Sequence, residues 1–528
     1  MFALQNPMRL LMQLALLVAA CLLAGCASLP SRPPVTPVAA LAASDATALG
    51  KIAAEMSAGQ PPENSSVRPL FQASFALDAR LELMRRAQSS LDVQTYQLGN
   101  DKTGRLILRE LRDAARRGVR VRLLLDDFYT TGMDRLLLAL ASEPNAEVRL
   151  FNPFVSGRDH SMTRWMNFLG DFRRLNHRMH NKSFVADGAF AIAGGRNLAD
   201  EYFLRSDTAN FIDMEVVMSG PVVPQLARAF DSYWNSEVVY PLETVASSLD
   251  SPARLRVDFD SATSGPGTPP PDAPDENDAF GDPPLGKQLD SGKPSWIRAH
   301  AEAMADIPTK ALGGGPFPTK TLATEMHAVA GQAKSEVAIV SPYFIPGEDG
   351  MERMRALRAR GVKITIATNS MADSDEPLVN VNYNRYRVAL LQEGVTLLEV
   401  STRQLKRSGQ LRRILKQARG RLHAKLAIID REWVLLGSMN LDPRSARLNT
   451  EVGVRVHSSE LAHALIYAYR MDDIEGVYRV ELKPDGKSVQ WVGTGDEVNE
   501  VLDEEPDSSL LTRLQLLLFS WFVPSDQL

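Results

Sequence analysis

Two parts of the chain carry the same succession of strand-like and helix-like runs. Residues 91–97 are rich in β-forming side chains, 103–116 have helical periodicity, and 119–125 form a short apolar run. The same order returns in three segments of the second half, 336–343, 351–360 and 362–368. Strands that alternate with helices predict an α/β fold in which helices cover a sheet.

The repetition has a constant spacing. The segment RGVRV contains Gly118, and the related segment RGVKI contains Gly361, 243 positions later (361 − 118). His180 and His423 are separated by the same 243 positions (423 − 180). Two independent landmarks with one offset indicate two copies of one domain rather than a chance motif match.

The pattern HxKxxxxD occurs once in each copy, beginning at His180 and at His423. Its remaining members are Lys182, Asp187, Lys425 and Asp430. A small-residue turn follows each copy and ends at Asn197 or at Asn440. Residues two apart on a strand share a face, so each His and its Lys should point the same way. Each Asp falls in the turn after the strand, where it fits a supporting role better.

These residue types suit phosphoester chemistry. Lysine and asparagine can hold the non-bridging oxygens of a phosphate, and histidine can attack phosphorus or donate a proton near neutral pH. Two facing copies would supply one histidine for each task, with the lysines in place of a metal ion. No His/Cys cluster has the spacing of a zinc site, so neither a metal nor another cofactor is expected.

The doubled motif and its G-[GS]-x-N turn resemble the phospholipase D superfamily, and the stretches FRRL, MHNKSF and NLDPRS are similar to C-type bacterial cardiolipin synthases. The resemblance covers roughly residues 70–475. It implies two pseudo-symmetric α/β domains, each a mixed sheet flanked by helices, that share one active site at their interface. It also implies metal-independent catalysis through a covalent phosphohistidine.

The resemblance assigns roles residue by residue. His180 resembles the nucleophile and His423 the general acid, within a catalytic set that also contains Lys182, Lys425, Asp187 and Asp430. The implied phosphate-binding residues are Asn197, Asn440 and Ser438. Glu451 resembles the carboxylate that orients a catalytic histidine, and its counterpart in the first half is either Asp213 or Glu215. Gly195 replaces the serine of the second copy, so one hydroxyl donor is missing from the first half.

Composition suggests six segments. They are a signal peptide (1–25), a tether (26–69), a first domain (70–246), a flexible acidic linker rich in Pro and Gly (247–295), a second domain (296–480) and a C-terminal tail (481–528).

Within the tail, 510–522 is apolar but too short to span a bilayer. It could lie in the membrane interface or dock on the core. Residues 168–175, with Trp165 nearby, are expected to pack, with a substrate-entry loop as the alternative.

The N-terminus suggests membrane attachment. The apolar run 10–23 is short for a spanning helix and ends in LAGC, which resembles the lipoprotein box that makes Cys26 the acylated N-terminal residue. The only other cysteine, Cys21, lies inside the signal peptide. The expected product is a lipid-anchored protein facing the periplasm, on either the inner or the outer membrane.

Together these features predict a phosphatidyltransferase that transfers a phosphatidyl group to phosphatidylglycerol, with phosphatidylethanolamine as a further candidate substrate. Hydrolysis of the same intermediate by water, a phospholipase D activity, is the alternative. A nuclease or a non-catalytic scaffold is less well supported. The net charge of −5 argues against a nucleic-acid partner. Whether a small partner protein exists stays open.

Overall fold

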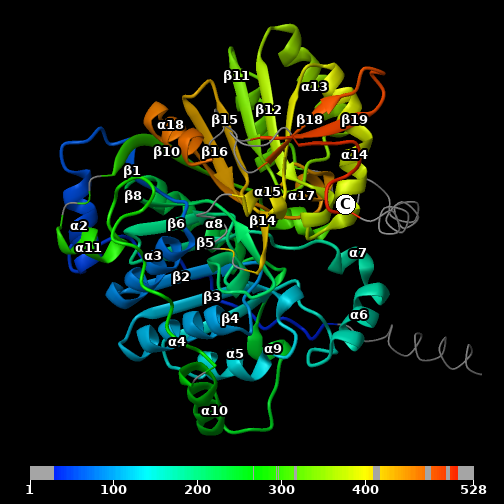
Figure 1. The fold of residues 1–528 in the computed structure, drawn as a ribbon. Coiled ribbons are helices and arrows are strands. Elements are labelled where there is room, and N and C mark those ends of the chain that lie inside the picture. The colour runs from blue at the N-terminus through cyan, green and yellow to red at the C-terminus, as the bar shows by residue number, and fades with distance from the viewer. Residues whose placement is uncertain are drawn as a thin grey trace, which may run out of the picture.

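The computed structural model describes residues 29–265, 267–292, 294, 296–313, 318–407, 415, 417–469, 477–494 and 500–508. Its two halves stack one above the other, and strands of both halves meet at the junction (Figure 1). No helix in the described ranges combines the length and hydrophobicity needed to cross a bilayer. Cys26 and the apolar segment 510–522 lie outside these ranges.

The first half is a mixed sheet whose strands pair in the order β9-β4-β3-β2-β5-β6-β8-β1. Its strands are β1 (Asn64–Leu70), β2 (Ser90–Thr95), β3 (Arg120–Asp126), β4 (Ala146–Phe151), β5 (Ser183–Ala186), β6 (Phe190–Gly194), β8 (Glu215–Ser219) and β9 (Val239–Pro241). Its helices are α2 (Ala48–Ser57), α3 (Ala73–Arg86), α4 (Lys102–Arg116), α5 (Asp134–Ala141), α6 (Ser161–Gly170), α7 (Phe172–Leu175), α8 (Val222–Trp234) and α9 (Leu242–Val245).

The second half repeats this pairing in the order β10-β17-β16-β15-β11-β12-β13 and extends it by three strands. Its strands are β10 (Ile297–Ala305), β11 (Glu336–Val340), β12 (Lys363–Asn369), β13 (Thr396–Val400), β15 (Leu426–Ile429), β16 (Trp433–Gly437), β17 (Val452–His457), β18 (Val477–Leu482), β19 (Val489–Gly493) and β20 (Val501–Leu502). Its helices are α12 (Leu322–Ala330), α13 (Gly347–Ala359), α14 (Pro377–Gln392), α15 (Thr402–Leu405), α17 (Pro443–Arg447) and α18 (Ser459–Ala468).

The halves join through strands and a shared core. β1 pairs antiparallel with β10, so one pairing order runs through 18 strands. Val67 and Val216 of the first half belong to the same buried cluster as Ala299 and Val454 of the second. A second, parallel pairing joins β7 (Ala209–Ile212) to β14 (Arg419–Leu422). Burial of this apolar surface favours one relative placement of the halves.

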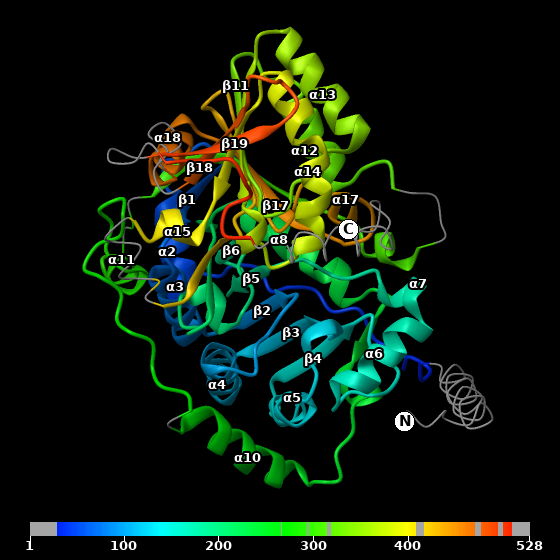
Figure 2. The same ribbon diagram turned by 45° about the vertical axis from the view of Figure 1, so that its right-hand side comes forward.

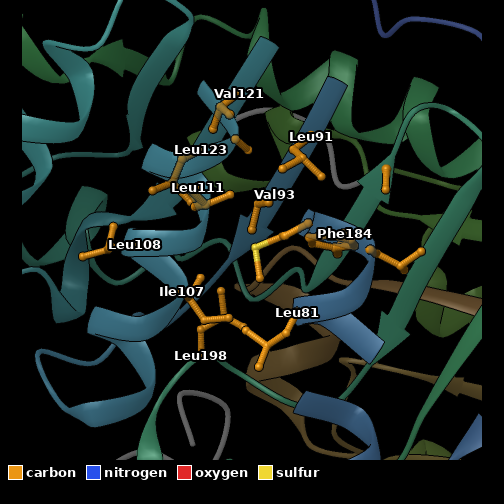
Figure 3. Close-up of a cluster of buried hydrophobic side chains, with 14 of the residues drawn as sticks. Leu81, Leu91, Val93, Ile107, Leu108, Leu111, Val121, Leu123, Phe184 and Leu198 are labelled. Carbon is orange, nitrogen blue, oxygen red and sulfur yellow. The ribbon is translucent and has the colours of Figure 1, made fainter. Parts of the chain in front are cut away.

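Within the first half, amphipathic helices pack their apolar faces on the sheet. Leu108 and Leu111 of α4 lie against Val121 and Leu123 of β3 in a fully buried cluster (Figure 3). Asp101 begins α4, because its side chain accepts the amide of Gly104. The α/β prediction is confirmed, with the mixed sheets and flanking helices that the resemblance implied.

Three predicted segment limits differ from the structure. The range predicted as a tether contains α2 and β1, and the amides of Val38 and Ala40 already donate to Asn235, which follows α8, and to Asp231 within α8. The predicted flexible linker forms α10 (Pro252–Ser264) and α11 (Leu285–Asp290), which pack on the first half (Figure 2). The sheet continues beyond residue 480 through β19 and β20. Sparse apolar residues at wide intervals, such as Leu255 and Phe259, are enough to bury one helix face, and composition alone did not reveal this.

Candidate active site

The first motif histidine is positioned by a short parallel bridge between the halves. Met179 pairs with Thr450 in this bridge, and the amide of His180 donates to the Thr450 carbonyl at 2.9 Å. The residues that follow the bridge, His180 and Glu451, therefore lie side by side. Nδ1 of His180 is 2.9 Å from a Glu451 carboxylate oxygen, and both side chains are buried.

The second motif histidine is positioned in the same way by β7 and β14. Ile212 ends β7 opposite Leu422, which ends β14. The next residue of each strand is Asp213 or His423, and the His423 amide donates to the Ile212 carbonyl at 2.8 Å. Nδ1 of His423 is 2.6 Å from the Asp213 carboxylate. Parallel strand ends thus deliver a histidine and a carboxylate together at two places.

Each histidine takes its carboxylate from the other half of the chain. Asp213, one of the two residues between which the sequence could not decide, occupies this position. Glu215 does not, because it forms buried ion pairs with Arg80 and Arg196. Neither half contains both members of either of these two motif pairs, so the arrangement exists only when the halves pack together. Because each pair uses Nδ1, Nε2 of each ring is the atom nearer a substrate, and Nε2 of His423 also lies 3.1 Å from Nζ of Lys425.

Both motif lysines are buried next to the histidines. Nζ of Lys182 donates to the His180 carbonyl at 2.7 Å and lies 5.3 Å from the centre of the Tyr96 ring. Nζ of Lys425 lies 3.0 Å from Nδ1 of His423. Burial lowers the pKa of Lys182 to about 7 and that of Lys425 to about 8. The negative charge of a bound phosphate would favour the charged form of both lysines.

The two histidine–carboxylate pairs are electrically unequal. Burial, with the charge of the nearby lysines, lowers the pKa of His180 well below its ordinary value. Burial raises the pKa of its partner Glu451 to about 7. Burial also lowers the pKa of His423, but Asp213 opposes that effect. Burial alone would raise the pKa of Asp213; the charge and hydrogen bond of His423, with the charges of Lys425 and Arg196, together outweigh it, so the pKa of Asp213 is lowered. The first pair therefore favours a neutral imidazole, and the second favours an ionised carboxylate.

Ser438 supports Glu451 instead of facing a substrate. Its hydroxyl donates to the Glu451 carboxylate and accepts the amide of Val452 at 3.0 Å, so its proton is already used, and a role in phosphate binding stays a prediction. At the matching position, a Cβ on Gly195 would lie 2.2 Å from Asp213 Oδ1. The glycine therefore leaves room for the Asp213 carboxyl, which any side chain at this position would have to displace.

The two asparagines differ in their surroundings. Asn197 donates through Nδ2 to the Tyr202 hydroxyl at 2.7 Å and accepts the Gln97 amide at 3.2 Å. Asn440 is buried, and its Oδ1 has no hydrogen-bond partner in the described structure. Asn440 is thus the freer of the two amides.

Asp187 and Asp430 stabilise the turns behind the site. The Asp187 carboxylate accepts the backbone amides of Gln88, Ser89 and Ser90, and Asp430 accepts those of Lys334, Ser335 and Glu336. Both have a positive φ, 52° and 54°, which Asp tolerates better than most residues. The placement of these residues at the turn is as predicted, but neither is among the hydrogen-bond partners of a motif histidine, so membership of the catalytic set is not supported.

Two aromatic residues at the site were missed by the sequence reasoning. Tyr96 packs edge-on to His180 and Tyr202 edge-on to His423, each with ring centres 5.0 Å apart. Nothing in their local sequence distinguishes them from packing residues. His177 bonds to the Leu448 carbonyl and lines a cavity beside α7. Among the described residues, no group of three or more His, Cys, Asp and Glu side chains is placed to hold a metal ion.

Comparison with known proteins gives a family match over both halves. The family model described as "Cardiolipin synthase, PLD-like domain" matches residues 81–234 and 327–471. These ranges contain both HxKxxxxD motifs and both carboxylates that contact the histidines.

Individual relatives agree with the family match. The chain is 35% identical to cardiolipin synthase C of Escherichia coli (strain K12) over 470 residues, 87% of this chain and 96% of that protein. It is 30% identical to an uncharacterized protein of Helicobacter pylori (strain J99) over 78% of this chain and 82% of that one. The crystal structure of phosphatidylserine synthase from Haemophilus influenzae shares the fold, with a TM-score of 0.55 at 14% identity, over 87% of this chain and 93% of that one.

Proposed function

Because the chain belongs to the cardiolipin synthase family built from phospholipase D-like domains, we propose that it transfers a phosphatidyl group to phosphatidylglycerol through a phosphohistidine. The observation that carries this proposal is the pair of buried histidines, each held through Nδ1 by a carboxylate of the opposite half. One histidine can then form a bond to phosphorus while the other handles the proton of the leaving alcohol.

The unequal electrostatics support His180 as the nucleophile. A nucleophilic imidazole must be neutral, and the environment of His180 lowers its pKa well below the ordinary value. In the first step, Nε2 of His180 attacks phosphorus and the bond from phosphorus to the headgroup oxygen breaks. His423, paired with the ionised Asp213, gives its proton to that oxygen, and the headgroup alcohol leaves.

The second step reverses these roles with a new alcohol. His423 removes the proton from a hydroxyl of phosphatidylglycerol, whose oxygen attacks phosphorus. The bond from phosphorus to Nε2 of His180 breaks and cardiolipin is released. Lys182, Lys425 and Asn440 would hold the non-bridging oxygens in both steps, since charge stabilisation in a buried site is strong. The donor lipid is phosphatidylglycerol or phosphatidylethanolamine.

Hydrolysis is the second candidate function, because water could replace the acceptor alcohol in the same position. Incubation with phosphatidylglycerol, with and without EDTA, followed by lipid chromatography, separates the two. Cardiolipin as the product supports transfer, and phosphatidic acid supports hydrolysis. Loss of activity in EDTA would contradict a metal-independent reaction.

A trapping experiment tests the roles of the histidines. With a ³²P-labelled phosphodiester that has a good leaving group, His423→Ala should accumulate label on the protein, because the leaving group needs no proton. His180→Ala should carry no label on any substrate. Label on His423 in the parent protein would reverse the assignment.

The same proposal places the enzyme at a membrane. Acylation of Cys26 would anchor the chain on the periplasmic side, and its lipid substrates lie in the bilayer. Radiolabelled palmitate incorporated by the parent protein and lost in Cys26→Ser would support this anchor. Equal labelling of both proteins would contradict it.

A further inference from the structure

The helix α6 has its polarity reversed relative to an ordinary surface helix. Its only charged residue, Arg164, is buried, pairs with Asp127 at 3.1 Å and stacks 4.3 Å from the Phe154 ring. Its large outward side chains are apolar, beside the small polar Ser161 and Thr163; Met162 is 72% exposed and Leu169 68%. A surface helix normally buries its apolar side. Exposed apolar side chains that cluster in one patch indicate a surface that binds a protein, a ligand or a membrane.

The exposed side chains form one patch on two consecutive helices. α6 and the short helix α7 lie at the outer edge of the first half, below its junction with the second (Figures 1 and 2). The apolar docking patch is defined by Met162, Trp165, Met166, Leu169 and Phe172, all exposed. Arg173, at the end of the patch, is also exposed. The patch therefore combines a large apolar area with a cation at its border, and no acidic residue lies within α6.

A row of aromatic contacts connects this patch to the active site. Trp165 and Phe172 both contact Phe168, with ring centres 5.6 and 5.4 Å apart. Phe168 contacts Phe128, which adjoins Tyr129. Tyr129, itself 43% exposed, contacts Tyr96, the residue that packs on His180. The exposed patch and the buried histidine are therefore joined by directly packed rings on one side of the molecule.

The first residue of the described chain, Leu29, lies next to the apolar docking patch. Leu29 and Phe172 line one cavity of about 960 Å³, together with Leu312 and His177. Cys26, the proposed acylation site, is three residues earlier, a distance that an extended chain covers in about 11 Å. An acyl anchor on Cys26 would therefore hold a bilayer close to the apolar docking patch.

We propose that the apolar docking patch inserts into the interface of a phospholipid bilayer that contains anionic lipid, and that this contact turns the active site toward its substrates. Trp165 suits the headgroup region because its ring is apolar and its N–H is polar. Arg173 would meet anionic headgroups. This inference rests on the proposed function for the identity of the lipid and on the proposed acylation for the anchor.

Quenching of tryptophan fluorescence tests insertion without any assay of activity. The full chain is mixed with phosphatidylglycerol vesicles whose acyl chains are brominated or plain. The parent protein should be quenched more strongly by brominated vesicles than Trp165→Phe, because the other five of its six tryptophans remain in both proteins. Equal quenching of the two proteins would overturn the proposal.

A kinetic comparison tests the orienting role. Met166→Asp/Leu169→Asp should lower activity on vesicle phosphatidylglycerol by about tenfold or more, because charged groups replace two exposed apolar side chains that the bilayer would bury. Its activity on monomeric short-chain phosphatidylglycerol should stay close to that of the parent. Val257→Asp on α10 and Tyr467→Asp on α18 replace other exposed apolar side chains far along the chain; they are the matched controls and should change neither activity.

Three other outcomes would overturn the proposal. Equal loss on both substrates would show that the patch serves the fold or the site. Equal loss in the control variants would show a general effect of added charge. A parent protein that is dimeric in light scattering, with a monomeric double variant, would assign the patch to a second copy of the chain. Inactivity of the parent on both substrates would refute the proposed function alone, since quenching reports insertion separately.

Discussion

The Glu451 carboxylate lies 2.9 Å from Nδ1 of His180, although the two residues are 271 positions apart. The second pair, Asp213 and His423, is separated by 210 positions. In this pair the first half supplies the carboxylate and the second half supplies the histidine. The duplicated domain thus forms its site by exchange, since each half supplies a histidine to one pair and a carboxylate to the other. This exchange couples catalysis to the packing of the halves.

Removing the negative charge of either carboxylate should lower activity without unfolding the protein. We expect Glu451→Gln and Asp213→Asn each to lower kcat by about 10²–10⁴-fold, the usual contribution of acid–base groups. A substrate with a good leaving group should restore the first step of Asp213→Asn, because His423 is then not needed as an acid. It should not restore Glu451→Gln. Burst kinetics measure this difference, and equal rescue of both variants would contradict the assigned roles.

Placing at Gly195 the serine that the second half has at the matching position should lower activity. Gly195→Ser reproduces the residue found at Ser438, but its Cβ would meet Asp213 Oδ1 at 2.2 Å. We expect this variant to lose more activity than Ser438→Ala, which removes one hydrogen bond to Glu451, worth about 1.5–3 kcal/mol when the acceptor is charged. Steady-state kinetics on both variants provide the measurement. A fully active Gly195→Ser would show that Asp213 can move freely.

Asp187 should affect stability more than chemistry. Asp187→Ala removes the acceptor of the Gln88, Ser89 and Ser90 amides. Ser90 is buried, and its unsatisfied amide should cost about 1–3 kcal/mol. Urea unfolding would show the loss, while kcat per folded molecule should stay near the parent value. A large fall in kcat with unchanged unfolding would return Asp187 to the catalytic set.

The lysines should produce an alkaline limit of activity. The pKa values of Lys182 and Lys425 are lowered to about 7 and about 8. Each side chain is charged below its pKa, so the phosphate clamp is present at lower pH and is lost as pH rises through 7 to 8. We expect kcat/KM on a monomeric substrate to fall across this range, since kcat/KM reports the free enzyme. His180, with its strongly lowered pKa, stays neutral throughout. A profile that is flat to pH 9 would contradict the lowered lysine pKa values.

Much of the framework could be predicted from local pattern. The strand and helix order around Gly118 and Gly361 follows from periodicity over a few residues, and so does the turn position of Asp187 and Asp430. Elements with weak patterns were missed. α10 buries few apolar side chains, and its acidic, proline-rich surroundings resemble a flexible linker.

The α/β fold, the duplication and the two His–Lys motifs can all be read from the chain before it folds, because they depend on neighbours within a few residues and on a constant offset. The folded molecule was needed to learn that Asp213, and not Glu215, contacts His423, that Ser438 supports Glu451, and that Trp165 is exposed where packing was expected. These facts depend on which strand ends meet across more than 200 residues of chain and on which face of α6 is covered. Both are set by the packing of the two halves and by the burial of Arg164, which no local pattern encodes.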